Sequence, residues 1–297
     1  MNSFGRLFRT EIFGESHGEA VGVVIDGVPP GLEIGINDFA NDIDRRRGGL
    51  KGTTPRKDKD IPEIISGVFN GRATGAPICL IFRNTGKNSD EYKPDLLPRP
   101  GHADFTSHIK YGGFADYRGG GHFSGRVTIG LVAAGVIAKK IISPLQVTSE
   151  ILEIGGSSDF DAVIDEALSQ SDSVGGIVEC RAMGVPAGLG EPFFDSVESL
   201  ISHIVFSIPA IKGIEFGAGF RLAAMKGSES NDIITGKSGK TRTNNAGGIN
   251  GGITSGNDIV FRVAVKPTPS IGREQETINL ETGEKAPIKL SDRKSVV

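Results

Sequence analysis

Short stretches of alternating apolar and polar residues run through this chain, and a period of two is typical of half-buried β-strands. The alternation and the β-branched residues are clearest at 21–25, 76–82, 145–154, 175–182, 211–216 and 259–265. Weaker patterns predict further strands over 4–13, 61–69 and 220–224. Asn70-Gly71 lies between two of these segments and is a hairpin-type turn signal.

Helical periodicity predicts helices over 38–47, 127–142, 161–170 and 195–208. The second of these is apolar nearly all round, so we expect it to be buried. In the first, Phe39, Ile43 and Arg46 fall on one face. Arg46 therefore needs a partner, for which we consider Asp42 at i−4 or an anionic ligand.

The mixture of hairpins and helices, without a repeat or a clear linker, predicts one α+β domain over residues 1–297. The net charge of −3 argues against a general nucleic-acid binder. Two cysteines without paired spacing indicate neither a disulfide framework nor a cysteine-based zinc site. No signal-peptide pattern or membrane-length apolar run is found, so we expect a cytoplasmic protein away from membranes. The 43 glycines, roughly twice ordinary usage, predict many positive-φ turns.

Candidate chemistry is concentrated in residues 99–126, which contain three of the five histidines and a triple glycine before the apolar helix. Unpaired N–H groups at such a glycine run can bind an anion, with Arg118 and Arg126 adding charge. His17, flanked by Gly14 and Gly18, is a candidate acid or base, although a structural turn histidine is an equal alternative.

Other ligand classes fit less well. Gly236-Lys237-Ser238 lacks the earlier glycine of a P-loop, and the histidines lack metal-site spacing. RNA binding would rest only on Arg45–Arg47 and the lysines of the glycine-rich loop. The residues alone thus indicate a site for phosphorylated small molecules with histidines as proton carriers, but not the reaction.

At these residues the chain resembles the chorismate synthase family, over nearly its whole length. The motifs that carry the resemblance occur in family order: FGESHGEAVG at 13–22, DGVPPG at 26–31, DRRR at 44–47, RPGHAD at 99–104, YRGGGHFSGR at 117–126, GVPAGLGEP at 184–192, NAGGI at 245–249 and KPTPS at 266–270.

The resemblance implies a β-α-β sandwich of two antiparallel sheets with helices on the outside, assembled as a homotetramer. It implies a carbon–oxygen lyase that converts 5-enolpyruvylshikimate 3-phosphate to chorismate and phosphate by a 1,4-anti elimination with reduced FMN. NADPH or an external flavin reductase would supply the reduced flavin.

The resemblance also implies roles for individual residues. His17 would protonate the departing phosphate, and His102 would lie beside the flavin and favour its reduced form. Arg46 and Lys51 match positions tied to substrate or nicotinamide phosphate, with Lys51 replacing the family's usual arginine. The matches to flavin-contacting positions are His122, Phe123, Ser124, Ala210, Gly251, Lys266, Pro267, Thr268, Pro269, Ser270 and Arg293, where the family often has Arg-Ser at 122–123.

The end of the sequence departs from the family pattern. Members continue with an Arg-His-Asp-Pro motif and a long helical segment, whereas this sequence has Arg293 followed by Ser295 at the aspartate position. We therefore expect a C-terminally truncated or altered member. A catalytically impaired FMN- or phosphate-binding remnant is the alternative function.

Overall fold

The structure is a computed structural model that describes residues 1–53, 58–86 and 97–290. Its contacts divide the chain into two compact units. The first unit contains residues 1–141, 166–173 and 268–297, and the second contains 142–165 and 174–267. The prediction of one domain over the whole chain stays a prediction.

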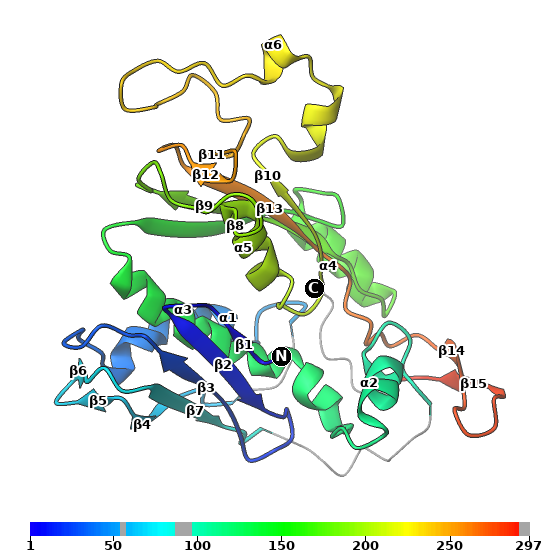
Figure 1. The fold of residues 1–297 in the computed structure, drawn as a ribbon. Helices are drawn as coiled ribbons and strands as arrows, with labels where there is room; N and C mark the ends of the chain where they lie inside the picture. Colours follow the sequence, from blue (N-terminus) through cyan, green and yellow to red (C-terminus); the bar gives the residue numbers. More distant parts are fainter. Residues whose placement is uncertain (54–57, 87–96, 291–297) are drawn as a thin grey trace. The chain divides into compact units, whose positions relative to one another are not determined.

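The first unit is built on an antiparallel five-stranded sheet of order β1-β2-β3-β7-β4 (Figure 1). The central strand β3 has two buried valines and a buried isoleucine among its seven residues and pairs Val23 with Ile12 on one side and Leu80 on the other. The strands are β1 (Ser3–Phe4), β2 (Arg9–Gly14), β3 (Ala20–Asp26), β4 (Glu63–Ser66) and β7 (Ile78–Arg83).

A small hairpin of β5 (Val68–Phe69) and β6 (Arg72–Ala73) comes between β4 and β7 in the sequence. Asn70 and Gly71 both have positive φ, 49° and 72°, as a type I′ turn requires. The predicted turn is therefore confirmed, but it joins β5 to β6 rather than to β7.

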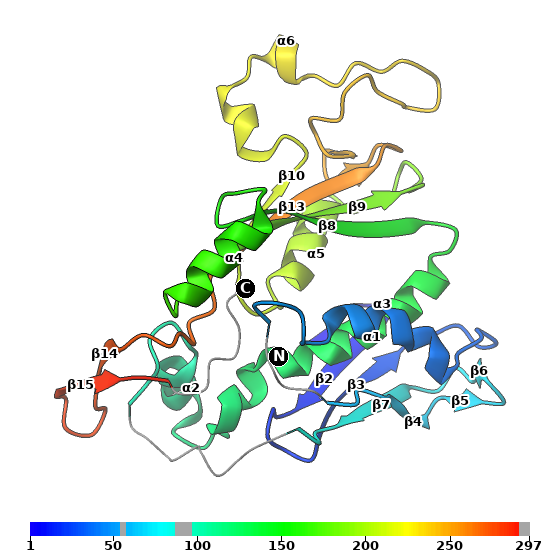
Figure 2. The same cartoon turned by 180° about the vertical axis from the view of Figure 1, so that it is seen from behind.

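The predicted apolar helix is α3 (Ile129–Ile141), preceded by the 3₁₀ helix η3 (Gly125–Thr128). It packs on β3, and α1 (Ala40–Arg46) packs against it on the same side of the sheet in both views (Figures 1 and 2). A Cβ at Gly130 would lie 3.1 Å from the carbonyl oxygen of Gly22, so glycine permits this close approach. The helical run Arg118–Ile141 has the length and hydropathy of a membrane span, but half of its most apolar window is buried within the protein, as in the core helix of a soluble protein.

Three further elements of the first unit are polar, and the apolar pattern did not predict them. The helix α2 (Asp104–Tyr111) has no buried residue. The antiparallel hairpin β14 (Gln275–Ile278) and β15 (Lys285–Ile288) is half exposed. Because neither buries a continuous apolar face, hydrophobic periodicity carries little signal for them. The 3₁₀ helix η1 (Ile36–Phe39) extends the predicted helix 38–47 at its start.

The second unit contains an antiparallel sheet of order β10-β13-β9-β8, which is formed by four of the predicted strands. One face of β13 carries Ile259 and Phe261, which join an apolar cluster with Val197 and Ile201 of α5. The opposite face of the sheet carries charged side chains from three strands, among them Arg262 of β13. The elements are β8 (Gln146–Ile154), α4 (Phe160–Ser169, which continues into the first unit), β9 (Gly176–Met183), α5 (Val197–Val205), β10 (Ile211–Phe216), α6 (Gly227–Ser230), β11 (Ile249–Asn250), β12 (Ile253–Thr254) and β13 (Ile259–Val265).

The prediction of a strand over 220–224 is wrong, because this segment is the 3₁₀ helix η4 (Gly219–Ala224). Gly217 and Gly219 both have φ of 57°, which turns the chain away from β10. The Glu215 carboxylate then accepts the N–H of Phe220 at 3.0 Å, so that N–H is satisfied without a strand partner. With antiparallel sheets and packed helices in both units, the predicted α+β class is confirmed.

Candidate active site

His17 lies in a buried turn between β2 and β3, with 5% of its surface exposed. The turn is closed by the N–H of Gly18, which donates to the Glu15 carbonyl at 3.1 Å. The side-chain amide of Asn84 donates to two carbonyls of the same turn, Glu15 and Gly18, at 3.0 Å each. His17 therefore lies within a turn whose first and last carbonyls both accept a hydrogen bond from the Asn84 side chain.

The triple glycine packs directly against this turn. The Ser16 N–H donates to the Gly121 carbonyl at 3.0 Å, and His122 Nδ1 lies 2.9 Å from the Gly14 carbonyl oxygen. All three glycines have positive φ, and a Cβ added to Gly119 would clash with the imidazole ring of His17. Glycine is thus needed here for its backbone conformation and for the close approach of the ring.

Arg126 extends the same network into the core, where its side chain is 5% exposed. Its Nε donates to Asn84 Oδ1 at 2.9 Å, and its Nη1 donates to Asp60, with Asp58 at 3.9 Å. The predicted anion-binding cation is therefore engaged by internal carboxylates. Arg118, the other expected cation, forms a two-pronged pair with Asp116, which lowers the pKa of that carboxyl.

Arg46 lies at the end of α1 and reaches the same region. Its Nη2 donates to the Gly125 carbonyl at 2.9 Å, and its Nη1 is 3.7 Å from Asp60. The prediction of Asp42 as its partner is wrong, because Asp42 pairs with Lys139 of α3 at 2.6 Å. The anionic ligand that was the alternative stays a prediction, as does the role of Lys51, which is exposed in the turn region after α1.

His102 lies in a loop that is closed by an arginine–aspartate pair. Arg99 donates from its backbone N–H, Nε and Nη2 to the Asp104 carboxylate at 3.0, 2.7 and 2.8 Å. Burial would raise the pKa of Asp104, but the hydrogen bonds and charge of Arg99, with a smaller contribution from His102, hold this pKa below its ordinary value. His102 Nε2 is 2.8 Å from the hydroxyl of buried Ser270.

The positions matched to flavin contacts are divided between the two units. In the first unit, the structure brings His102 and Ser270 together and places His122 beside the His17 turn. Ser124 caps η3 by accepting the Arg126 N–H at 3.3 Å, and Phe123 is 40% exposed. Thr268 accepts a hydrogen bond from Ser173 at 2.6 Å through its carbonyl. Pro269 is half-buried next to it, and Arg293 lies outside the described residues.

In the second unit, Ala210 and Lys266 are adjacent, with the Lys266 N–H donating to the Ala210 carbonyl at 2.9 Å. Ala210 has a φ of 73°, unusual for a residue with a Cβ. Gly251 lies in the β11–β12 turn, and a Cβ there would meet nothing within 4 Å. Pro267 is exposed after β13.

These donors fit the needs of a flavin. The imidazole of His102 and the hydroxyl of Ser270 form a neighbouring pair that can bond to the polar edge of an isoalloxazine ring.

Two residues of the site gave no signal in the sequence. Asn84 follows β7 in a polar segment, and Asp60 lies in a charged loop. Their roles depend on tertiary contacts with the His17 turn and with Arg126, so no local pattern marks them. In the folded structure the two residues share their burial, since each is 6% exposed.

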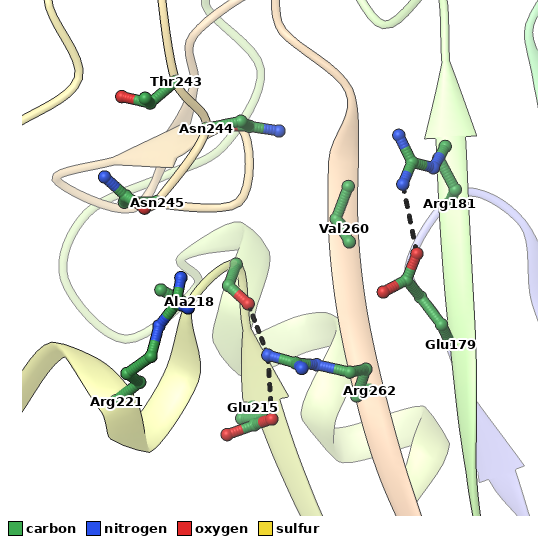
Figure 3. Close-up of a pocket in the computed structure, with 11 residues that line it drawn as sticks. Glu179, Arg181, Glu215, Ala218, Arg221, Thr243, Asn244, Asn245, Val260 and Arg262 are labelled. Carbon is green, nitrogen blue, oxygen red and sulfur yellow. Dashed lines mark hydrogen bonds and ion pairs between the residues drawn. The ribbon is translucent and has the colours of Figure 1, made fainter. Parts of the chain in front are cut away.

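A separate pocket of about 530 Å³ lies on the charged face of the second unit's sheet (Figure 3). Arg262 donates to the Gly217 carbonyl at 2.8 Å and pairs with Glu215 at 2.9 Å, and Arg181 pairs with Glu179 at 3.1 Å. None of the predicted catalytic or flavin-contacting residues lines this pocket.

Comparisons with known proteins agree with the sequence motifs. The family model for chorismate synthase matches residues 8–297. A chorismate synthase of Chitinophaga pinensis is 62% identical over 286 residues, covering 96% of this chain and 86% of that protein. A chorismate synthase of Thermococcus kodakarensis is 44% identical over 317 residues, covering 97% and 89%. A solved structure described as chorismate synthase superposes with a TM-score of 0.74 at 30% identity and covers 89% of this chain and 86% of its own.

Proposed function

This chain belongs to the chorismate synthase family, and we propose that it converts 5-enolpyruvylshikimate 3-phosphate to chorismate and phosphate by a 1,4-anti elimination. Membership makes it a lyase of aromatic amino-acid biosynthesis. In the proposed reaction a ring C–O bond to phosphate and a ring C–H bond break, and a second ring double bond forms.

The observation that carries the proposal is the fixed, buried position of His17. Its turn is held by Asn84 on one side and by the triple glycine on the other. Histidine suits proton transfer at neutral pH because the ordinary pKa of an imidazole lies near 6.5. His17 protonates the phosphate as it leaves, which reduces the cost of the charge that develops on its oxygens.

Arg46 and Lys51 are the proposed cations for the phosphate. Arg46 is only partly exposed and is held by its bonds to the Gly125 carbonyl and Asp60, so its guanidinium is positioned before a ligand arrives. Lys51 offers a point charge on a flexible stem and cannot form the two-pronged contact of an arginine.

When bound, reduced FMN would supply electron density to the substrate and take it back, so the reaction would have no net redox change. His102, oriented by Ser270 and by the Arg99–Asp104 pair, would bond to the flavin and favour its reduced form. The further flavin contacts are those of residues 122–124, 210, 251, 266–270 and 293. We also propose that the protein is a cytoplasmic homotetramer and that NADPH or a separate reductase supplies the electrons that reduce the flavin.

The direct test is anaerobic turnover of 5-enolpyruvylshikimate 3-phosphate with chemically reduced FMN, monitored by released phosphate and by chorismate. The His17→Ala variant is the control, and we expect it to lose about 10²- to 10⁴-fold in kcat. Absence of chorismate from a folded wild-type protein that binds FMN would reject the proposed activity. Light scattering tests the tetramer, and NADPH oxidation without an added reductase tests the source of electrons.

A further inference from the structure

The side chain of Asn84 lies between the backbone carbonyls of the His17 turn and the cationic guanidinium of Arg126. Its side chain is almost fully buried, at 6% exposure for the residue. On one side it meets the His17 turn, and on the other it meets the guanidinium of Arg126. The partners on the two sides determine which of them the NH₂ group faces and which the amide oxygen faces.

The orientation of this amide follows from its partners. The Glu15 and Gly18 carbonyls can only accept hydrogen bonds, so the NH₂ group must face them, at 3.0 Å each. Arg126 Nε can only donate, so the amide oxygen must face it, at 2.9 Å. The Asn84 backbone N–H adds a bond to the Glu19 carbonyl at 3.0 Å. No other side chain of this size both donates twice and accepts once in this arrangement.

The carboxylate of Asp60, which contacts two arginines, adds to this network. Asp60 accepts from Arg126 and lies 3.7 Å from Arg46, so one acidic side chain connects the two guanidinium groups. Asp58 lies 3.9 Å from Arg126, and its carboxylate accepts the backbone N–H groups of Thr85 and Gly86, which follow Asn84. The segment 84–86 is therefore fixed from both sides.

We propose that Asn84 is a positioning residue for His17: it holds the turn in the conformation that directs the imidazole toward the substrate and connects this turn to Arg126, Asp60 and Arg46. This inference rests on the proposed function, in which His17 transfers the proton. Asn84 itself does not touch the reacting atoms. Its effect on the reaction is exerted through His17.

The variant that isolates this role is Asn84→Asp. A carboxylate is nearly the same size and still accepts from Arg126, but it cannot donate to the Glu15 and Gly18 carbonyls. Asn257→Asp is the matched control, since the Asn257 amide also donates to a backbone carbonyl, of Gly239 at 3.1 Å, and accepts a backbone N–H, of Thr241 at 3.2 Å. Asn257 lies in the second unit, outside the proposed machinery.

We expect Asn84→Asp to lower kcat roughly ten- to a hundredfold while KM changes much less, and Asn257→Asp to leave kcat near the wild-type value. In a His17→Ala background, Asn84→Asp should change kcat little further, because residues that act as a unit are not additive. An equal fold-loss in both backgrounds, or an unchanged kcat in the single variant, would overturn the proposal.

A second measurement does not need turnover, and it separates this proposal from the activity itself. In histidine-labelled protein, the NMR signal of His17, assigned by its absence in His17→Gln, should move in Asn84→Asp, while the signals of His108 and His203 stay in place. An unmoved His17 signal would overturn the positioning role. If the wild type makes no chorismate, the proposed function fails, and this signal still decides whether Asn84 sets the position of His17.

Discussion

The backbone of Gly119 lies so close to the ring of His17 that a Cβ on Gly119 would overlap Cε1 and Nδ1 of the imidazole. The ring and the glycine come from segments about a hundred residues apart, and their contact sets where the imidazole is. We therefore expect Gly119→Ala to displace His17 and to lower kcat at least about tenfold.

Gly120→Ala is the matched variant for this prediction. Gly120 also has positive φ, 85°, so alanine costs roughly 1–2 kcal/mol of backbone strain there too. A Cβ at Gly120 would meet only the Ser124 Cβ at 3.9 Å. Turnover and thermal unfolding of both variants should show similar losses of stability but a greater loss of kcat in Gly119→Ala. Equal kcat values would mean that the ring moves aside at no cost.

Asp60→Asn should destabilise the first unit strongly. The substitution removes the nearer carboxylate of buried Arg126 and leaves Asp58, at 3.9 Å, as the remaining one; breaking a buried ion pair costs up to about 3–5 kcal/mol. Asn tolerates the positive φ of 53° at this position, so the backbone is not the cause. Asp26→Asn, which breaks the exposed pair with Arg9, is the control and should change the urea midpoint little. Similar midpoints for the two variants would contradict the prediction.

Asp104 should make the folded protein more sensitive to acid. Its pKa in the folded state is below the ordinary value because Arg99 outweighs the effect of burial. The stabilisation is therefore complete above the unfolded-state pKa, near 3.9, and is lost as the pH falls through the lower folded-state pKa. Thermal melts of wild type and Asp104→Asn should differ most near neutral pH and converge on acidification. A difference that does not depend on pH would contradict this account.

The two cysteines should react slowly in the folded protein. Both are free thiols, and burial raises the pKa of Cys79 and of Cys180. Since the thiolate is the reactive form, alkylation by iodoacetamide near neutral pH should be much slower in native protein than in urea. Mass spectrometry of the alkylated protein gives the rate at each site. Equal rates in native and unfolded protein would show that the thiols are accessible and ionise normally.

The sequence predicted the elements that bury a continuous apolar face. The strand at 21–25 and the helix at 127–142 were found because their apolar residues form the core of the first unit. The exposed helix α2 and the hairpin β14–β15 have no such face, and Phe220–Ala224 has apolar residues whose glycine neighbours direct the chain into a 3₁₀ helix instead.

The sequence indicated candidate residues for the site but none of the bonds between them. His17 and the triple glycine were recognised, yet their mutual contact depends on the packing of β2 against η2 (Arg118–Phe123). For Arg46 we considered Asp42 or an anionic ligand, whereas the structure supplies Asp60 from a distant loop. Asn84 and Asp60 act only through tertiary contacts, which no spacing in the sequence marks.

The hydrogen bond between His102 and Ser270 joins residues 168 positions apart, and Thr277 donates to the Pro98 carbonyl across 179 positions. During synthesis, at about 5–20 residues per second, the His102 loop therefore waits roughly 10–30 s for the segment that completes it. All of the second unit is made in that interval. The nascent chain must keep the first unit's sheet and α3 soluble without this contact, so the histidine beside the proposed flavin is among the last parts of the site to be set in place.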